Sequence, residues 1–212
     1  MSWKLVKYIA ITGVLNCKSG LRVGGSKDEI GIGDMDNPII RHPLTKYPYI
    51  PGSSLKGKLR SLCEYREGLV PPDGQPHGCE KEGCMVCRVF GPHKKARHPH
   101  GPTRLIVRDA LLTTASAEQL VAAQAQGLNF AEVKSENWIN RNTGTAGDPR
   151  TQERVPAGTQ FDLAMSVRIF EVDDEQKIRD FIKQALEWLP HDTLGGSGTR
   201  GYGWVELDYN IG

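Results

Sequence analysis

The sequence predicts an α+β fold of the ferredoxin-like (RRM-like) type, which is a βαββαβ core with two insertions. The order of the predicted elements is strand, helix, strand, strand, helix, strand. One insertion, at residues 68–102, is rich in Gly, Pro, Cys and His and has almost no hydrophobic periodicity. The other, at 131–157, has two polar arms around a tip at 144–149. We therefore expect one domain over residues 1–212, with a zinc-binding insertion and a protruding hairpin.

Residue type predicts the four core strands. Stretches rich in β-branched and aromatic residues lie at 3–15, 103–113, 160–170 and 204–209. Residues 18–43 contain five glycines, which disfavour a long regular element. We expect that segment to be a loop.

Apolar periodicity and N-cap residues predict the two core helices. The first begins at Ser53 or Ser54, whose hydroxyl can accept a hydrogen bond from an unpaired backbone N–H, and ends near Glu67. The second covers 173–189, with Asp173 or Asp174 as its N-cap. Residues 117–127 are compatible with a further short helix.

Composition is typical of a soluble globular protein without a strong charge bias. The chain has 212 residues and a formal net charge of only +2, so any basic surface must come from local clustering. Its apolar runs are too short to cross a bilayer, and its first residues lack the pattern of a signal peptide. We expect a cytoplasmic protein that does not enter a membrane.

Residues 51–60, Pro-Gly-Ser-Ser-Leu-Lys-Gly-Lys-Leu-Arg, form a predicted turn that leads into the first helix. A helix N-terminus carries unpaired N–H groups and the positive end of the helix dipole, which suit a phosphate. We expect a polynucleotide backbone to be held by the following residues of this helix start: Ser53, Ser54, Lys56, Lys58 and Arg60. The alternative is an ordinary amphipathic helix with surface lysines.

Two aspartates, Asp34 and Asp36, lie in a glycine-flanked loop upstream of this helix. Carboxylates near phosphates can hold Mg²⁺, which can polarise a scissile phosphate or activate an attacking oxygen. The alternative is that both residues only form turns. A calcium-binding EF-hand is excluded, because Pro38 occupies a ligand position and the later Gly and Glu of that motif are absent.

Three of the five cysteines crowd into residues 79–87, which in a reducing compartment favours a metal over disulfides. We predict a structural zinc ion in a closed Cys₃His site with these ligands: His77, Cys79, Cys84 and Cys87. Three other histidines, His93, His98 and His100, are alternatives for the fourth ligand, and unrelated thiols are the alternative to a metal. We expect Cys17 and Cys63 to be buried or inert.

Residues 195–203, Gly-Gly-Ser-Gly-Thr-Arg-Gly-Tyr-Gly, let the backbone approach a phosphate closely. We expect Arg200 to bind a phosphate and Tyr202 to stack on a base; the alternative is a tight helix-to-strand connection. The predicted hairpin offers four further cations, including Lys134, unless it is a solvated loop. The three that we expect to contact RNA are Arg141, Arg150 and Arg154.

Five stretches in this order resemble the repeat-associated (RAMP) superfamily of CRISPR proteins, above all the backbone-subunit family of type III-A Csm effector complexes. They are Gly24-Gly25-Ser26 with Asp36-Asn37-Pro38, residues 51–60, Arg104-Leu-Ile-Val-Arg-Asp109, Glu132-Val-Lys with Glu136-Asn137, and residues 195–203. The resemblance runs from about Tyr8 to the C-terminus.

This resemblance implies a subunit that binds a CRISPR guide RNA, self-associates into a helical backbone, joins other Csm subunits and cleaves target RNA at regular intervals. It implies that Asp36 is catalytic with a divalent ion, that a 2′-hydroxyl attacks to leave a cyclic phosphate and a 5′-hydroxyl, and that the hairpin is a thumb that wedges into the guide–target duplex. We expect Arg22, Ser26 and Lys27 to contact RNA.

One residue departs from the family pattern. The family often has a histidine where this chain has Arg22, and arginine cannot act as a general base near neutral pH. Two competing functions stay open from the sequence: a non-cleaving guide-RNA-binding filament subunit, and a free-standing metal-dependent ribonuclease.

Overall fold

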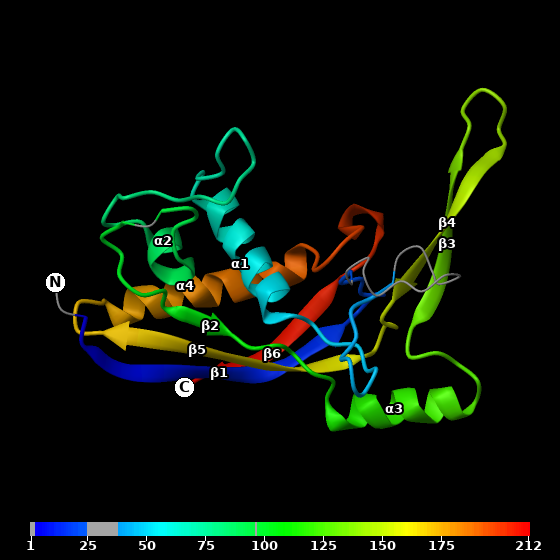
Figure 1. Cartoon of the computed structure of the whole chain (residues 1–212), viewed down its shortest axis with the longest axis horizontal. Helices are drawn as coiled ribbons and strands as arrows, with labels where there is room; N and C mark the ends of the chain where they lie inside the picture. The colour runs from blue at the N-terminus through cyan, green and yellow to red at the C-terminus, as the bar shows by residue number, and fades with distance from the viewer. Residues whose placement is uncertain (1–2, 25–37, 96) are drawn as a thin grey trace.

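The computed structural model describes residues 3–24, 38–95 and 97–212 (Figure 1). Its elements, in chain order, are β1 (Leu5–Cys17), α1 (Gly52–Arg66), α2 (Met85–Phe90), β2 (Leu105–Val107), α3 (Thr114–Ala125), β3 (Glu132–Ile139), β4 (Ala146–Arg154), β5 (Gln160–Phe170), α4 (Glu175–Trp188), the 3₁₀ turns η2 (Leu189–His191) and η3 (Gly198–Arg200), and β6 (Val205–Ile211). The predicted α+β class is confirmed.

A four-stranded sheet forms the centre of the molecule, in the order β2-β5-β1-β6. All three neighbouring pairs are antiparallel. Helices α1 and α4 cover one face of this sheet (Figure 1). Side chains alternate along each strand, so Ile11 and Leu15 of β1 are buried under the helices, whereas Tyr8 on the other face is 58% exposed.

The predicted apolar stripes of both core helices are buried. In α1 they are Leu55, Leu59, Leu62 and Cys63, and in α4 they are Ile178, Phe181, Ile182, Ala185 and Leu186. Asp174 caps α4 by accepting a hydrogen bond from the Lys177 N–H, as one of the two predicted caps. None of the helices in the described ranges is long and apolar enough to span a membrane.

The start of α1 differs from the prediction. Neither Ser53 nor Ser54 is the N-cap, because the helix begins at Gly52 and both serines lie inside its first turn. The Gly52 N–H instead donates to Asp109 Oδ1 at 2.7 Å. Asp109 reaches this position because Ile50 and Ala110 form an antiparallel bridge. A Cβ at Gly52 would lie 2.6 Å from the Val107 oxygen, so the close approach requires glycine.

Three further features differ from the prediction. The strand expected at 103–113 is only β2, because after Val107 the regular ladder with β5 is interrupted: Ala110 bridges Ile50, and Leu112 returns to bridge Phe161 of β5. The hairpin turns at 140–145, which overlaps only the start of the predicted tip at 144–149, and there the Asn140 side chain accepts from the Asn142 and Thr143 N–H groups. The segment 68–102 contains a helix, α2, that the absence of periodicity did not predict.

The β3–β4 ribbon is the other sheet, and it projects from the body of the molecule (Figure 1). Its strands pair from Glu132 opposite Arg154 to Ile139 opposite Ala146, with an irregularity between Glu136 and Trp138. Trp138 covers Gly147 on the facing strand, where a Cβ would lie 2.4 Å from the indole ring. In the outer part of the ribbon, most residues on both strands are exposed to solvent.

Candidate metal centre and polyanion-binding surface

The four predicted metal ligands come together in the structure. One ligand atom from each of His77, Cys79, Cys84 and Cys87 lies within 4.8 Å of all the others. The Cys79 and Cys87 sulfurs are 3.9 Å apart, and Cys84 Sγ is 3.6 Å from His77 Nε2. A tetrahedral zinc ion, with bonds of about 2.3 Å to sulfur and about 2.0 Å to nitrogen, separates its ligand atoms by roughly 3.5–3.8 Å. The donor set and its spacing therefore fit a closed zinc site.

Two kinds of structure carry these ligands. Cys84 and Cys87 belong to α2, as its N-cap and a first-turn residue, whereas His77 and Cys79 come from the loop before it. Burial raises the pKa of the Cys84 thiol and raises that of Cys87 to about 12, so both thiols stay protonated near neutral pH unless a cation binds them. The His100 ring donates from Nε2 to the Cys79 oxygen at 2.8 Å and is not part of the cluster.

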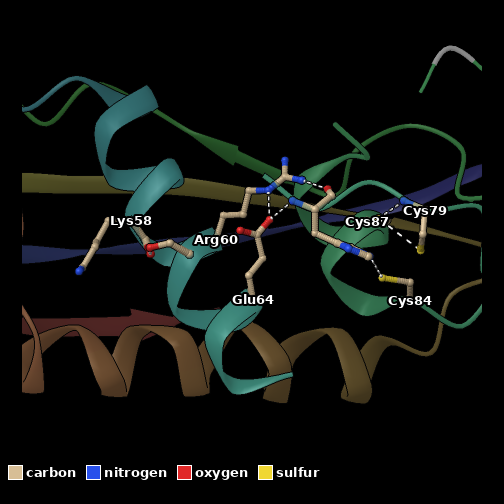
Figure 2. A network of polar contacts seen from close by, with 8 residues as sticks. Lys58, Arg60, Glu64, Cys79, Cys84 and Cys87 are labelled. Atoms are coloured by element: carbon tan, nitrogen blue, oxygen red, sulfur yellow. Dashed lines mark hydrogen bonds and ion pairs between the residues drawn. The ribbon is translucent and has the colours of Figure 1, made fainter. Parts of the chain in front are cut away.

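Arg60, predicted to contact RNA, supports the loop that carries His77 and Cys79, called the metal loop below (Figure 2). Its Nε donates to Glu64 Oε1 at 2.7 Å, and its Nη2 donates to the His77 oxygen. Its side chain is only 15% exposed. Lys58 extends away from this network and pairs with Asp192 at 2.9 Å (Figure 2). Of the three cations predicted at the start of α1, Lys58 and Arg60 are therefore already paired with protein groups.

The start of α1 borders a cleft of about 390 Å³ that contains the third cation, Lys56. Ser53 lines the same cleft, and Arg168 of β5 approaches it from the sheet. Burial, followed by repulsion from Arg60 and Arg168, lowers the pKa of Lys56. Neither Lys56 nor Arg168 has an ion-pair partner within the described ranges. Ser54, half-buried in the same turn, completes this small cationic surface.

The glycine loop at 195–203 packs on the chain just after β1. The Gly196 N–H donates to the Arg22 oxygen at 2.8 Å, and the Gly203 N–H donates to the Gly20 oxygen at 3.0 Å. Gly195 has φ +79°, and a Cβ there would lie 2.2 Å from the Arg22 oxygen. Its glycines thus serve close backbone packing, and Arg200 stands exposed at the loop surface.

Tyr202 does not offer its ring to a base in this conformation, contrary to the predicted stacking role. The ring is fully buried, with Lys134 Nζ 4.7 Å and Arg154 Cζ 4.9 Å from its centroid. Burial, together with the nearby Glu136 carboxylate, raises the pKa of Tyr202 to about 12. The reason is a tertiary contact. The ring is covered by the foot of the β3–β4 ribbon, which is the end nearest the body of the molecule and includes Lys134 and Arg154.

Glu136 joins the ribbon to the glycine loop. Its carboxylate pairs with Lys134 and with Arg200, each at 3.4 Å. The Tyr202 hydroxyl is the main cause that lowers the pKa of Glu136, and these two cations lower it further. Glu136 and Arg200 also line a cleft of about 440 Å³, with Asn137, Trp138 and Arg150.

The remaining predicted cations lie along the ribbon. Arg154 makes two hydrogen bonds to Glu132, at 3.0 and 2.6 Å, and this carboxylate raises the pKa of Arg154. Arg141 and Arg150 are exposed, and Arg141 Nη1 donates to the Ile139 oxygen at 2.5 Å. Among the cations of the ribbon, all of which lie in the described ranges, only Arg141 and Arg150 of its outer part therefore have no carboxylate partner.

The predicted catalytic residue Asp36, with Asp34, Ser26 and Lys27, lies outside the described residues. The described residues on either side are paired: Gly24 bridges Ile39, and the Ile40 N–H donates to the Val23 oxygen at 3.0 Å. The Ile39 N–H also donates to Glu153 Oε2 at 3.0 Å. The described residues that flank this segment thus adjoin other parts of the candidate site: Arg22 contacts the glycine loop, and Ile39 contacts Glu153 of the ribbon.

The prediction missed the acidic residues that hold these pieces together. They are Glu64, Asp109, Glu136 and Glu153. Glu64 had a signal, because it follows Arg60 by four residues on the same helix face. Asp109 and Glu136 stood within stretches that carry the family resemblance, but nothing in the sequence showed which groups they contact.

Comparison with known proteins gives consistent relationships over nearly the whole chain. The profile of the RAMP superfamily matches residues 14–206. The "CRISPR system Cms endoribonuclease Csm3" of Methanothermobacter thermautotrophicus is 43% identical, over 95% of this chain and 84% of that protein. The protein of the same name from Streptococcus thermophilus is 36% identical, over 98% of this chain and 89% of that protein.

Solved structures agree with these relationships. A chain in the crystal structure of a Csm3–Csm4 subcomplex of the type III-A CRISPR-Cas interference complex has a TM-score of 0.59 and 26% identity, over 100% of this chain and 79% of that one. A chain of the type III-B Cmr-beta complex bound to cognate target RNA has a TM-score of 0.65 and 16% identity, over 97% of this chain and 61% of that one, a likeness of fold alone. The chain belongs to the RAMP superfamily of CRISPR proteins and, within it, to the Csm3 family of type III-A systems.

Proposed function

We propose that this chain is a cytoplasmic backbone subunit of a type III-A interference complex that binds the CRISPR guide RNA and cleaves complementary target RNA at regular intervals. The observation that carries this proposal is its similarity to the Csm3 endoribonucleases, at 36% to 43% identity over at least 94% of its length. Its partners are the guide RNA, the target RNA, other Csm subunits and further copies of itself in a helical backbone.

RNA binding is assigned to two groups of cations and hydroxyls, one at the start of α1 and one along the glycine loop and the outer ribbon. Lys56 with Ser53 and Ser54 forms one contact at the start of α1, with Arg168 beside it. A second contact runs from the glycine loop to the outer ribbon and comprises Arg22, Arg141, Arg150 and Arg200, with Ser26 and Lys27 assigned from the sequence. Phosphate contacts of this kind position the RNA, and base pairing with the guide selects the target.

Four residues predicted to contact RNA take other or additional roles. Arg60 supports the metal loop, and Tyr202 is packed under the foot of the ribbon. Lys58 and Arg154 are paired with Asp192 and Glu132, and an RNA phosphate at either cation competes with its carboxylate. We assign their main role to holding α1, the glycine loop and the thumb in place.

The proposed reaction uses the nucleophile that RNA carries. The 2′-hydroxyl oxygen attacks the adjacent phosphorus, the bond from phosphorus to the 5′-oxygen breaks, and the products are a cyclic phosphate and a 5′-hydroxyl after one proton moves from the first oxygen to the second. Asp36 is assigned to the catalytic centre, where a bound Mg²⁺ or other divalent ion would supply charge neutralisation. Arg22 can stabilise developing negative charge but cannot act as the base.

The His77, Cys79, Cys84 and Cys87 cluster is assigned to a structural zinc ion. A closed set of four protein ligands leaves no position for water, so its role is in folding. The spacing of the donor atoms supports this assignment. The ion would order the segment 68–102 over α1.

We infer that the core is ferredoxin-like, with the zinc-binding segment and the thumb as its insertions. The sheet order β2-β5-β1-β6, with every pair antiparallel, supports this. In this reading β1, β2, β5 and β6 are the four core strands, and α1 and α4 are the two core helices.

One assay tests this function against its competitors. Guide-loaded complex is incubated with complementary target RNA, with and without Mg²⁺. Metal-dependent cuts at regular spacing support the proposal. Binding without cuts identifies a non-catalytic filament subunit, and cutting by the guide-free protein identifies a free-standing ribonuclease.

A further inference from the structure

The backbone of His77 is held at both its N–H and its C=O by one largely buried ion pair of α1. Glu64 Oε1 accepts from the His77 N–H at 2.8 Å, and Arg60 Nη2 donates to the His77 oxygen. Arg60 and Glu64 also bond to each other at 2.7 Å (Figure 2). Their side chains are 15% and 7% exposed. Burying two charges is costly unless their polar atoms find partners, and the His77 backbone supplies its N–H to Glu64 and its oxygen to Arg60.

The peptide oxygen of Cys79 is held in a similar way from the other side. His100, only 1% exposed, donates from Nε2 to that oxygen at 2.8 Å. The backbone oxygen of His100 in turn accepts from Arg104 Nη1 at 2.6 Å. Arg104 is anchored by Asp173 at 2.7 Å, in an ion pair that is completely buried. A continuous chain of polar contacts thus runs from the loop before α4 to the loop ligand Cys79.

The other two ligands need no such support. Cys84 and Cys87 are fixed by α2, where the Arg88 and Gly91 N–H groups donate to their backbone oxygens at 3.0 Å. The loop ligands have no helix to hold them, and each has a buried side chain that does so. This difference in support between the loop ligands and the helix ligands is expected, because contacts that hold a ligand in its orientation strengthen metal binding.

We propose that Glu64 and Arg60, on one side, and His100, on the other, are positioning residues of the metal centre, which hold the backbones of His77 and Cys79 at ligating distance. None of the three touches the ion. This inference rests on the proposed zinc site and deepens it. It also gives Arg60 a role that explains why a cation of the polyanion-binding helix points toward the metal loop.

The test measures metal affinity in the full-length chain. Metal-free protein, kept reduced, is titrated with Co²⁺, whose visible and near-ultraviolet bands report thiolate ligation, and Zn²⁺ affinity is obtained by displacement. Glu64→Ala and His100→Ala should each weaken Zn²⁺ binding by about 10- to 100-fold and speed its release to a chelator. Glu64→Gln and His100→Gln should recover part of the loss, because an amide can still accept from the His77 N–H or donate to the Cys79 oxygen.

Lys58→Met is the matched control, since Lys58 lies on the same helix but extends away from the metal loop (Figure 2). It should leave affinity and spectrum unchanged. Wild-type affinity in both alanine variants overturns the positioning role, and so does an equal loss in Lys58→Met, which would show that affinity only follows helix stability. Failure of the wild-type chain to give thiolate bands overturns the zinc site itself. If an alanine variant does not fold, Glu64→Met and His100→Phe decide, because they keep the packing volume and remove the hydrogen bond, and wild-type affinity in both of them contradicts the proposal.

Discussion

Asp109 accepts a hydrogen bond from the backbone N–H of Gly52 at 2.7 Å, and this contact caps α1 from a residue more than fifty positions later in the chain. We expect Asp109→Ala to lower the free energy of unfolding by about 0.5–2 kcal/mol, as loss of an N-cap does. Denaturant titration measures the change. Because the cap also positions Ser53 and Lys56, the variant should bind guide RNA more weakly.

Asp109→Asn keeps an oxygen acceptor and should recover most of the stability. Asp162→Ala is the matched control, because Asp162 is an exposed aspartate on β5 with no capping role. Equal stability of Asp109→Ala and Asp162→Ala would show that the cap does not contribute.

Lys56 and Lys58 are two residues apart on α1 but differ in their partners. Only Lys58 has a carboxylate partner within the described chain, Asp192. We expect Lys56→Met to weaken guide-RNA binding and to reduce the slope of log affinity against log salt by about 0.7, which is the loss of one phosphate contact on a single strand. Lys58→Met should change that slope less. A larger effect at Lys58 would contradict the assignment of the α1 cleft.

Substitutions of Tyr202 distinguish a packing role for its ring from stacking on an RNA base. We expect Tyr202→Phe to bind guide and target RNA as the wild type does, since the ring stays in place under the ribbon. Tyr202→Ala should lose about 3–5 kcal/mol of stability, because it removes a large buried side chain. A protein with Tyr202→Ala that folds with nearly unchanged stability but loses RNA binding would support base stacking instead.

The Glu136 carboxylate links the β3–β4 ribbon to the glycine loop, and we expect this link to depend on pH. Its folded-state pKa is lowered, chiefly by Tyr202 and also by Arg200 and Lys134. Its contribution to stability is therefore present above its unfolded pKa, about 4.3, and is lost as the pH falls through the lower folded value. We expect the stability gap between wild type and Glu136→Gln to be present at neutral pH and to close in acid, as measured by denaturant titration. A gap that persists in acid would exclude this carboxylate as its source.

Much of the core could be predicted because its signals are local. The strand β5 and the buried stripes of α1 and α4 follow from side-chain periodicity, and the grouping of His77, Cys79, Cys84 and Cys87 follows from their spacing. The short helix α2 has no such pattern, because its six residues are placed by the ligands and the core around them.

The errors concern partners that are far apart in sequence. A serine at a helix start is a good cap in isolation, but here a bridge between Ile50 and Ala110 brings Asp109 to the position first. Arg60 and Tyr202 carry the right chemistry for RNA, yet the His77 oxygen engages Arg60 and the foot of the ribbon covers Tyr202. Charge and residue type predicted that such groups matter, and only tertiary contacts determine which of them stay free.

The most direct test of the catalytic assignment compares Asp36→Ala with Asp34→Ala in guide-loaded complexes. Cleavage of complementary RNA in Mg²⁺ and equilibrium binding of that RNA are measured side by side. We expect Asp36→Ala to abolish cutting while target binding is retained, and Asp34→Ala to cut at the same regular positions as the wild type. Normal cutting by Asp36→Ala would contradict the catalytic assignment.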